Sequence, residues 1–443
     1  MIVSKFGGTS VADSNAIQKV LSILKQKEEQ TFVVVSAFSK ITDSLVDISN
    51  NLRNRNFSII QGKVDEIFYR HFHTAKELGV LPLVSDYLEE KKNKVNLLID
   101  ALKILGEISP RSVDLLLSFG ELLSSFIIYN FLKINSLEVL YVDPREIIVT
   151  DSNFNCADVD FEQTEEKLKK LMSENGNYKF FITGGFVGST LEGFTTTLGR
   201  GGSDYSASVI ASLLGASQLE IWTDVDGIMT TDPNLVPSAK LLDVVSYKEA
   251  SEMAIFGAKV LHPKTIFPAI EKNIPVYVRN TFNPNCNGTL ISSKFSENND
   301  VKAITYRKNN IVINIVSNRM LGAYGYLAKV FNVFKEFETE VDLVSTSEVS
   351  VSLTIDSRKR LGEIVKKLRE IAEVDVIENC VIVSVIGEGL KNSTSIAHRI
   401  FKVLDGIKIH MVSMGASDIN FSFVVNEEDY VEVVRLLHQE FFE

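Results

Sequence analysis

The chain has 443 residues, and 46 lysine and arginine residues against 57 aspartate and glutamate residues give it a formal net charge of −11. With 45% hydrophobic and 23% charged residues, the composition is that of a globular protein with a large core, which excludes a mainly disordered chain. The acidic balance argues against a dedicated nucleic-acid-binding protein, which normally carries a basic excess. At roughly 150 residues per domain, the length suggests about three domains.

The cysteine and histidine spacings favour no metal site. Cys156, Cys286 and Cys380 lie far apart, which fits reduced thiols better than a disulfide framework or a structural zinc site. His71 and His73 stand two residues apart, a spacing that a metal pair can use but that is more often structural. Apolar runs such as residues 32–35 are far shorter than the about 20 residues of a membrane span, and the N-terminal residues show no signal pattern. We therefore expect a cytoplasmic protein without membrane contact.

Short strand-like runs alternate with longer helical patterns through the first two thirds of the chain. Runs rich in β-branched and aromatic residues occupy residues 2–6, 32–36, 137–142 and 180–183. Helical periodicity occupies residues 17–25 and 113–132. This alternation predicts an α/β domain with a largely parallel sheet, in which ligands bind outside the carboxyl ends of the strands.

The last third of the chain repeats itself. Turn-forming residues dominate residues 280–300, which predicts a linker or domain edge. Beyond it, matching strand, helix, strand and strand patterns recur after about 70 residues. The first copy has them at residues 313–317, 327–337, 341–345 and 349–355, and the second at residues 383–387, 396–404, 409–413 and 419–425. Two copies are too few for a solenoid, so we expect a pair of small βαββ-type domains, which usually pair their sheets or bind small ligands at their interfaces.

A lysine and a pair of glycines follow the first predicted strand. Residues 5–10 read Lys-Phe-Gly-Gly-Thr-Ser. Adjacent glycines let a phosphate approach backbone N–H groups, and the lysine supplies a positive charge, although the spacing is not that of a P-loop. A glycine turn beside a surface lysine would explain the same residues.

A second glycine-rich segment surrounds an arginine. Residues 199–204 read Gly-Arg-Gly-Gly-Ser-Asp and precede a helix predicted over residues 205–214. Ser203 or Asp204 would be a good N-cap, and the helix N-terminus with the glycine amides favours an anion. Arg200 can bind a carboxylate or phosphate through two parallel hydrogen bonds. An ordinary loop before a capped helix is the alternative.

Two further segments carry polar or charged residues that a ligand could contact. Residues 222–228, Trp-Thr-Asp-Val-Asp-Gly-Ile, follow a predicted strand and carry groups that suit ribose or metal contacts, although Asx turns also explain such runs. Residues 256–263 offer Lys259 as a phosphate partner or as plain surface charge. Two lysines, one arginine, glycine loops and a few carboxylates, without a nucleophile–base pair, suit phosphoryl transfer, where catalysis depends on positioning and charge neutralisation.

Six motifs in order carry a resemblance to a known family. Besides residues 5–11, 199–207, 222–227 and 257–263, they are Val-Ser-Ala-Phe-Ser-Lys-Ile-Thr-Asp at 35–43 and Ser-Phe-Gly-Glu at 118–121. The chain resembles, over essentially its whole length, the monofunctional aspartate kinases of the amino-acid-kinase fold with two C-terminal ACT domains. The resemblance implies a three-layer α/β catalytic domain over residues 1–293. It also implies ferredoxin-like βαββαβ ACT domains over residues 305–376 and 377–443, with a strand from 299–309 as a candidate to complete the second.

The resemblance implies phosphorylation of the β-carboxylate of L-aspartate by ATP with Mg²⁺, giving 4-phospho-L-aspartate, the first step towards lysine, threonine, methionine and diaminopimelate. A carboxylate with a pKa of about 4 is ionised at neutral pH, so this nucleophile needs no general base. The difficulty is to bring one anion against another. Lys5, Lys259 and Mg²⁺ would neutralise that repulsion, and no protein residue is assigned as a metal ligand.

The matching motifs also assign residue roles. Arg200 would hold a substrate carboxylate and Glu121 the α-ammonium group, while Asp204 would organise the lysines. Further substrate contacts would come from Ser36, Thr42, Phe186 and Ser203. The nucleotide would contact Lys5, Gly7, Gly8, Thr223, Asp224, Met229, Asn234 and Lys259. Many members carry Tyr and Arg where this chain has Met229 and Asn234, and Gly where it has Lys40.

The repeats resemble ACT domains, which bind amino acids as feedback effectors. Residues 345–350 look like the corresponding stretch of lysine-inhibited members. The resemblance makes six residues candidates to hold L-lysine, with Asp342 and Glu348 pairing with its ammonium groups: Met320, Ala323, Val341, Asp342, Ser347 and Glu348. Alternatively, Met320 and Val341 are core residues. ACT units of this family associate between chains, so we expect a homodimer or a dimer of dimers.

Two other functions remain as alternatives. A kinase of the same fold acting on glutamate or acetylglutamate is opposed by the combination of Phe-Gly-Gly-Thr-Ser with twin ACT repeats. A catalytically silent amino-acid-sensing protein is opposed by the presence of Lys5, Glu121, Arg200 and Asp204.

Overall fold

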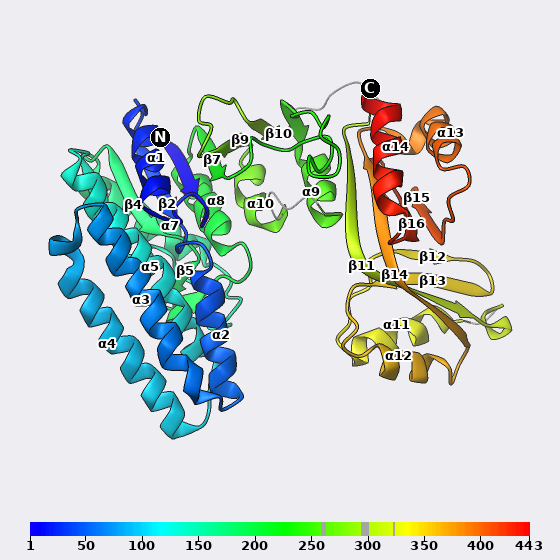
Figure 1. The fold of residues 1–443 in the computed structure, drawn as a ribbon, viewed down its shortest axis with the longest axis horizontal. Helices are drawn as coiled ribbons and strands as arrows, with labels where there is room; N and C mark the ends of the chain where they lie inside the picture. The colour runs from blue at the N-terminus through cyan, green and yellow to red at the C-terminus, as the bar shows by residue number, and fades with distance from the viewer. Residues whose placement is uncertain (258–262, 294–300, 322–323) are drawn as a thin grey trace. The chain divides into compact units, whose positions relative to one another are not determined.

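The computed structural model describes residues 1–257, 263–293, 301–321 and 324–443, and the chain divides into two compact units. The N-terminal unit consists of Met1–Ile228, Asp243–Val245 and Leu261–Ser293. The C-terminal unit consists of Met229–Leu242, Ser246–Val260 and Lys294–Glu443. Each unit has its own sheet, and Figure 1 shows both with their helices.

The N-terminal unit contains an eight-stranded sheet in the order β3-β4-β2-β1-β7-β9-β10-β8. Six neighbouring strands run parallel: β3 (Val139–Tyr141), β4 (Phe180–Gly184), β2 (Thr31–Val35), β1 (Ile2–Phe6), β7 (Gln218–Thr223) and β9 (Val276–Asn280). The strand β10 (Thr289–Ser292) pairs antiparallel with β9, and β8 (Val244–Ser246) ends the sheet. The α/β class with a largely parallel sheet is therefore confirmed.

Helices cover both faces of this sheet. On one face α8 (Gly202–Leu214) packs against β1 and β7, with α7 (Phe161–Asn175) and α10 (Pro263–Glu271) beside it. On the other face a large core cluster joins Phe6 and Trp222 to α1 (Ser14–Lys25) and a group of four helices. These four are α2 (Ile41–Arg53), α3 (Ile60–Glu77), α4 (Leu81–Leu105) and α5 (Pro110–Ile134). Because side chains alternate along β1, Phe6 enters this core while Lys5 points to the α8 side.

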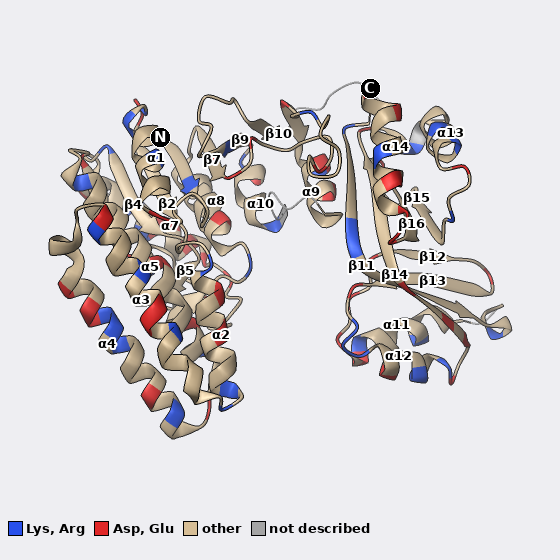
Figure 2. Ribbon diagram, viewed as in Figure 1, with Lys and Arg blue, Asp and Glu red and all other residues tan. Residues whose placement is uncertain are grey.

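The two longest helices differ in character. The exposed side of α4 carries charges of both signs, as Figure 2 shows. By contrast, α5 is buried almost all round, and it is the one helix among the described residues that is long and apolar enough to cross a membrane. Because 83% of its apolar window is buried within the protein, it behaves as a core helix. Short elements complete the unit: η1 (Phe57–Ile59), α6 (Pro144–Ile147), and the hairpin of β5 (Val187–Ser189) and β6 (Thr195–Thr197).

Residues 280–300, predicted to be a linker or domain edge, contain the boundary between the two units after Ser293, but they also contain β10. Thr289 and Ile291 are buried on this strand, and its residues pair with Val278, Tyr277 and Val276 of β9. The Asn and Gly residues before it form the connection from β9, so turn formers surround a strand too short to show in the composition. Residues 294–300 lie outside the described part of the chain.

The C-terminal unit is built on a six-stranded sheet in the order β12-β13-β11-β14-β16-β15. Its strands are β11 (Ala303–Val316), β12 (Val344–Thr346), β13 (Ser350–Ile355), β14 (Glu373–Ile386), β15 (Met411–Met414) and β16 (Asn420–Asn426). Its helices are α9 (Tyr247–Ile255), α11 (Tyr326–Glu336), α12 (Leu361–Leu368), α13 (Thr394–Val403) and α14 (Tyr430–Phe442), with short η2 (Asn318–Met320) and η3 (Leu390–Asn392). The two predicted repeats thus share one sheet, joined by the antiparallel pairing of β11 with β14.

One predicted strand is displaced. Residues 341–345 were expected to form it, but β12 begins at Val344. The hydroxyl of Thr354 accepts the N–H of Leu343 at 3.0 Å, and its carbonyl accepts the N–H of Asp342 at 3.0 Å. A side chain therefore replaces one ladder partner, which keeps residues 341–343 out of the regular strand.

Candidate active site

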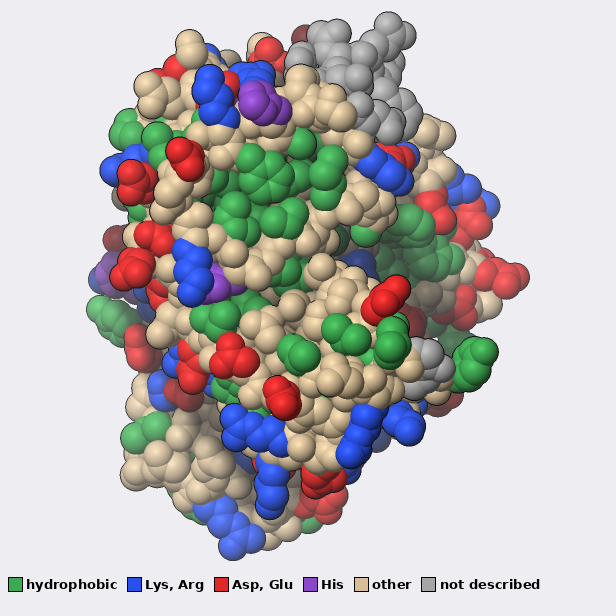
Figure 3. Space-filling view, turned by 90° about the vertical axis from the view of Figure 1, so that its right-hand side faces the viewer, with side chains coloured by type: hydrophobic (Ala, Val, Ile, Leu, Met, Phe, Trp, Pro, Cys, Tyr) green, Lys and Arg blue, Asp and Glu red, His purple; other side chains and the backbone are tan. Residues whose placement is uncertain are grey.

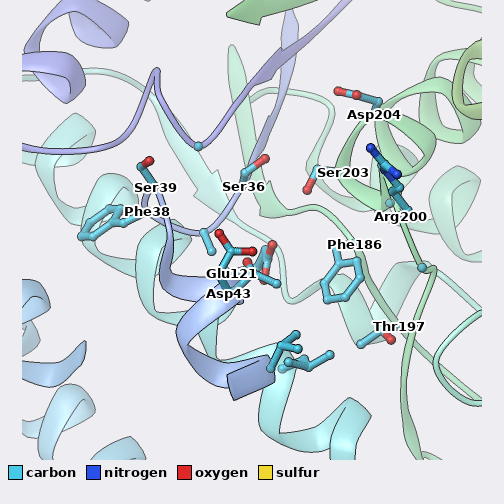
Figure 4. A pocket seen from close by; sticks show the side chains of 18 of the residues that line it. Ser36, Phe38, Ser39, Asp43, Glu121, Phe186, Thr197, Arg200, Ser203 and Asp204 are labelled. Carbon is cyan, nitrogen blue, oxygen red and sulfur yellow. The ribbon is translucent and has the colours of Figure 1, made fainter. Parts of the chain in front are cut away.

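A pocket of about 600 Å³ opens where β1, β2 and β4 end (Figure 4). The segments that follow these strands line it together with α2, α5 and the start of α8. All six residues predicted to contact substrate lie there: Ser36, Thr42, Glu121, Phe186, Arg200 and Ser203. Lys5, Gly8 and Asp204 line it as well. The structure thus brings together residues from four sequence motifs and Phe186, while their roles stay predictions.

Two glycines allow the walls of this pocket to approach each other. A Cβ on Gly120 of α5 would lie 2.9 Å from Cβ of Ala37, which follows β2. A Cβ on Gly185, which follows β4, would lie 2.7 Å from Cα of Ser203 in α8. Any larger residue at either position would push α5 or α8 away from the strand ends, so close packing explains Gly120 of the Ser-Phe-Gly-Glu motif and Gly185 after β4.

Lys5 and Asp204 form a buried ion pair on the α8 side of the sheet. Lys5 Nζ lies 2.6 Å from Oδ1 of Asp204, and the two side chains are only 11% and 15% exposed. Asp204 stands in the first turn of α8, where the helix dipole favours a negative charge. The pair therefore holds a lysine at the pocket without leaving either charge unpaired in a poorly solvated place.

The predicted N-cap of this helix is wrong. Neither Ser203 nor Asp204 caps α8, which begins at Gly202 after Gly201 with a φ of 73°. The left-handed conformation at Gly201 turns the chain into the helix earlier than a side-chain cap would. Asp204 is instead engaged by Lys5, so an electrostatic contact takes the place of a capping hydrogen bond.

Glu121 is a buried carboxyl group in an unusual state. It is 3% exposed, and its Oε2 has no hydrogen-bond partner among the described residues. Burial raises the pKa of Glu121 to about 8, although the N–H of Ala37 and the charge of Lys5 act in the opposite direction. A pKa of about 8 leaves the group mostly protonated at neutral pH, and a cation placed beside it would favour its ionised form.

The opposite wall carries Arg200 and Phe186. Arg200 is exposed and makes no ion pair with the described part of the chain, so its guanidinium is available to an anionic ligand. Phe186 has a φ of 65°, a left-handed conformation that costs a non-glycine residue of order 1 kcal/mol or more. The Oγ of Ser206 accepts its N–H at 3.0 Å and helps to hold this geometry. Figure 4 shows Phe186 and Arg200 on the same side of the pocket, across from Phe38 and Ser39.

The predicted nucleotide contacts of the N-terminal unit gather at the ends of β1 and β7. The N–H of Gly7 donates to the carbonyl of Trp222 at 3.0 Å, and a Cβ on Gly7 would lie 3.4 Å from Lys5 Nζ. Thr223 ends β7, and its hydroxyl donates to the exposed Asp224 at 3.2 Å. Gly7, Lys5 and the end of β7 are therefore neighbours, as strand register requires.

The other predicted nucleotide contacts do not lie among the described residues of the N-terminal unit. Met229 and Asn234 belong to the C-terminal unit, where residues 229–242 pack against α14 and β11. Thr230 Oγ1 lies 3.0 Å from His438 Nε2, the hydroxyl of Tyr306 donates to Asp232 at 2.7 Å, and Arg435 donates to the carbonyl of Leu235 at 3.2 Å. Lys259 lies outside the described residues.

The predicted effector residues are spread over several elements of the C-terminal unit. Met320 and Val341 belong to one core cluster, whereas Ser347 and Glu348 are exposed in the turn between β12 and β13. Ala323 lies outside the described residues.

Among the effector candidates that the structure describes, Asp342 is the one whose side chain forms an ion pair. Its Oδ1 lies 2.7 Å from Nη1 of Arg307, whose Nη2 lies 2.6 Å from Oδ2 of Asp356. Oδ2 of Asp342 is buried without a hydrogen-bond partner among the described residues, and burial raises the pKa of this group while Arg307 lowers it. One carboxylate oxygen is thus satisfied by the protein, and one is left for another cation.

Comparison with known proteins decides the family. Residues 1–280 match the amino acid kinase family, and residues 383–441 match an ACT domain. Lysine-sensitive aspartokinase 3 of Escherichia coli is 36% identical over 452 residues, which cover 100% of the chain and 99% of that relative. The aspartokinase of Saccharomyces cerevisiae is 34% identical over 485 residues, covering 99% and 92%. The chain belongs to the aspartokinase family. Enzymes of this family are ATP-dependent kinases of L-aspartate.

Solved structures of the family share the fold. E. coli aspartokinase III has been solved in complex with lysine and aspartate in a T-state, and with aspartate and ADP in an R-state. Each is similar to this chain with a TM-score of 0.87 and 36% identity, covering 100% of both chains. The amino-acid-kinase domain followed by ACT domains, expected from the motifs, is therefore confirmed.

One departure from the family pattern has a structural explanation. Lys40, where many members carry Gly, precedes α2 with a φ of 66° and makes no capping hydrogen bond through its side chain. A left-handed residue at this position favours glycine, so the chain accepts strain at the edge of its pocket. The Tyr-to-Met229 and Arg-to-Asn234 departures have no comparable explanation in the structure.

Several residues that line the pocket were missed. Asp43 and Ser39 lie within the motif at residues 35–43, and Asp43 stands one residue after Thr42 in the first turn of α2. Sequence neighbours in a recognised motif could have suggested both. Asn155 and Thr197 also line the pocket but come from a loop and a hairpin that no motif marks, so only the fold reveals them.

Of the two histidines, His71 is part of the core, whereas the side chain of His73 is half exposed. His71 is fully buried, its ring stacks on Phe38 with centroids 4.7 Å apart, and its Nδ1 lies 2.7 Å from the carbonyl oxygen of Ile67. Burial lowers the pKa of His71 to about 4, so the ring is neutral and donates through Nδ1–H. The His71 ring supports Phe38, which lines the pocket. Nδ1 of His73 lies 3.6 Å from Oε2 of Glu77.

Proposed function

We propose that the pocket of the N-terminal unit binds L-aspartate and that the chain transfers the γ-phosphate of ATP to the β-carboxylate, giving 4-phospho-L-aspartate. The observation that carries this proposal is the charge pattern of one pocket. Glu121 offers a buried carboxyl group to the α-ammonium, Arg200 an available guanidinium to a carboxylate, and Lys5 a charge at the end of β1. An amino dicarboxylate needs this combination. The aspartate complexes of E. coli aspartokinase III support it.

In this mechanism the protein positions reactants and neutralises charge. The ionised β-carboxylate attacks the γ-phosphorus, the bond to the β-phosphate oxygen breaks, and ADP leaves. Lys5 would stabilise the negative charge shared between carboxylate and phosphate, and Asp204 would fix its ammonium group. The hydroxyls of Ser36, Thr42 and Ser203 would orient the substrate.

Mg²⁺ fits this site as a companion of the nucleotide. The described residues contain no cluster of three or more His, Cys, Asp or Glu that could hold a metal ion by itself. Mg²⁺ usually keeps phosphate and water ligands and needs only one or two carboxylates, and the exposed Asp224, directly after β7, would supply one. When bound, the ion would neutralise charge on the phosphates.

A coupled assay for ADP release tests the reaction. Initial rates with L-aspartate, L-glutamate and N-acetylglutamate are compared at equal concentration, and 4-phosphoaspartate is trapped with hydroxylamine. We expect turnover with aspartate and at least about tenfold lower kcat/KM with glutamate, because one extra methylene would displace a carboxylate held between fixed charges. Preference for glutamate or acetylglutamate would reassign the substrate. Absence of ADP release with every acid would favour the silent sensor.

We also propose feedback inhibition by L-lysine through the C-terminal unit. The buried oxygen of Asp342 supports it, since an ammonium group is the natural partner of an unsatisfied carboxylate. The lysine-sensitive name and the lysine complex of the E. coli relative support it as well. The reaction would then begin the route to lysine, threonine, methionine and diaminopimelate. Titration of the activity with lysine, threonine and S-adenosylmethionine identifies the effector.

The expected homodimer, or dimer of dimers, remains a proposal. The end strands of the C-terminal sheet and α13 expose the apolar side chains Val344, Met414 and Phe401, which are 38%, 43% and 47% exposed. Figure 3 shows hydrophobic side chains gathered on one face between charged ones. Such patches are typical of protein interfaces. Sedimentation equilibrium with and without lysine measures the assembly, and the cytoplasmic location likewise stays a prediction.

A further inference from the structure

Asp114 is a buried carboxylate near the pocket that no motif explains. It lies on α5, is fully buried, and does not itself line the pocket. Both of its oxygens are engaged. The N–H of Asn155 lies 3.0 Å from each oxygen, the N–H of Thr197 donates to Oδ2 at 3.0 Å, and the hydroxyl of Thr197 donates to Oδ1 at 2.7 Å. A buried carboxylate whose donors among the described residues are all neutral is costly to maintain, so it calls for a specific use.

Both partners of Asp114 line the pocket. Thr197 ends β6, and Asn155 belongs to a surface loop with a φ of 71°. A second contact joins them, since the N–H of Ala157 donates to the carbonyl of Thr197 at 3.0 Å. Figure 4 shows Thr197 on the same side of the pocket as Phe186 and Arg200. Asp114 therefore ties two segments more than 40 residues apart in sequence, 155 and 197, to one helix.

These two segments support the turn that carries Arg200. A Cβ on Gly199 would lie 3.3 Å from the carbonyl oxygen of Asn155 and 3.4 Å from Sγ of Cys156, so the backbone before Arg200 rests on this loop. Thr197 is three residues before Arg200, and Leu198 between them donates its N–H to the carbonyl of Phe186 at 2.9 Å. The position of the arginine thus depends on the anchoring of Thr197 and Asn155.

The same face of α5 carries Glu121. Asp114 and Glu121 are seven residues apart, two turns of an α-helix, so their side chains leave the helix in nearly the same direction. Glu121 lines the pocket directly, whereas Asp114 reaches it through Thr197 and Asn155. One rigid helix therefore sets the separation between the carboxyl group and the guanidinium.

We propose that Asp114 is a positioning residue for the substrate site, holding Thr197 and Asn155 so that Arg200 faces Glu121 at the separation that an amino dicarboxylate requires. This inference rests on the proposed function of the pocket. It implies that losing the anchor weakens aspartate binding through Arg200 and leaves the nucleotide site, at the ends of β1 and β7, unaffected.

Asp114→Asn is the sharpest variant, since it keeps the shape but turns one acceptor oxygen into an NH₂ group that faces N–H donors. Steady-state kinetics should show a KM for aspartate raised about tenfold or more and a KM for ATP within about twofold of wild type. Hydrogen exchange should rise in peptides that cover residues 153–158 and 195–199. An unchanged KM for aspartate, or an equal rise in both KM values, would overturn the proposal.

Thr197→Val tests the same anchor with a milder change, in case Asp114→Asn does not fold. It removes the hydroxyl that donates to Asp114 but retains the N–H bond and the side-chain volume, so the KM for aspartate should rise about threefold to fivefold. The matched control is Thr164→Val. Thr164 is also fully buried, and its hydroxyl bonds the backbone of Val149 away from the pocket. This control should lose comparable stability without changing either KM, and an equal change of the aspartate KM in both variants would contradict the proposal.

Arg200→Ala distinguishes failure of the proposed substrate site from failure of the positioning role of Asp114. If it raises the KM for aspartate and Asp114→Asn does not, the substrate site stands and the positioning role fails. If it leaves the KM unchanged, the proposed site itself is wrong. In the double variant, Asp114→Asn should add little to the effect of Arg200→Ala, because the anchor acts through that arginine. Full additivity of the two effects would overturn the proposed route.

Discussion

Buried acidic side chains differ in their partners between the pocket of the N-terminal unit and the proposed effector region around Asp342 in the C-terminal unit. In the pocket, Glu121 has a pKa raised to about 8 by burial, its Oε2 has no hydrogen-bond partner among the described residues, and the Lys5–Asp204 ion pair keeps a lysine in place. In the effector region, Asp342 is already paired with Arg307, a cation from the protein itself. The first site is preorganised for its ligand, whereas in the second an incoming ammonium group would share a carboxylate with an internal partner.

This difference affects how much of the electrostatic interaction contributes to the binding free energy of a ligand at each site. In the pocket no internal ion pair with Glu121 has to be broken before the α-ammonium binds, although Glu121 must lose a proton below pH 8. A site with an internal partner gives only the difference between two ion pairs, which suits a regulator whose effect must be reversible. Substitutions in the pocket should therefore have larger effects than substitutions around Asp342.

Lys5→Ala should have the largest effect. Removal of the ammonium group leaves Asp204 as a buried unpaired carboxylate and removes the charge that would stabilise the transferring phosphoryl group. We expect kcat/KM to fall by at least about 10³-fold while the circular dichroism spectrum is retained. Lys25→Ala, at the exposed end of α1, is the control and should leave the rate unchanged. Turnover within about tenfold of wild type would mean that Lys5 does not touch the reacting atoms.

Glu121→Gln should have the next largest effect. We expect it to raise the KM for aspartate about 100-fold at pH 8.5. The neutral amide keeps the shape of the side chain but cannot pair with the α-ammonium. In the wild type, the pKa of about 8 means that each pH unit below 8 costs binding up to about tenfold, because the carboxyl group must lose a proton first. The wild-type KM should therefore fall as pH rises from 6 to 8 and then level off. A wild-type KM independent of pH would show that Glu121 does not pair with the substrate.

Asp342→Ala should leave kcat intact and raise the lysine concentration for half-inhibition more than tenfold. The substitution removes the carboxylate oxygen that has no partner and releases Arg307 to Asp356. Asp356→Ala is the matched control, since it removes the other partner of the same arginine, and it should change the half-inhibition by less than about threefold. Equal sensitivity of Asp342→Ala and wild type would place lysine elsewhere.

The sequence predicted the pocket better than the regulatory unit, for a physical reason. Strand ends of a parallel sheet converge, so motifs placed after β1, β2 and β4 had to meet, and α5 needed only its helical period to bring Glu121 there. Asp114 was not predicted, because its partners, Asn155 and Thr197, come from irregular segments whose position depends on tertiary packing. For the same reason, the pairing of Asp342 with Arg307 could not be read from two residues on different strands with no fixed spacing.

Lys40→Gly should have the smallest effect and the opposite sign. At a φ of 66°, a Cβ costs roughly 1–2 kcal/mol, whereas glycine adopts this conformation freely and loses about 0.4–1 kcal/mol through its more flexible unfolded chain. We expect a net gain of about 0–1.6 kcal/mol, measured as a rise of about 2 °C in the first thermal transition. Lys40→Ala separates the backbone from the side chain, since it removes the charge but keeps the Cβ. If alanine stabilises the protein as much as glycine does, the gain comes from the lost charge at the pocket edge, and the strain argument fails.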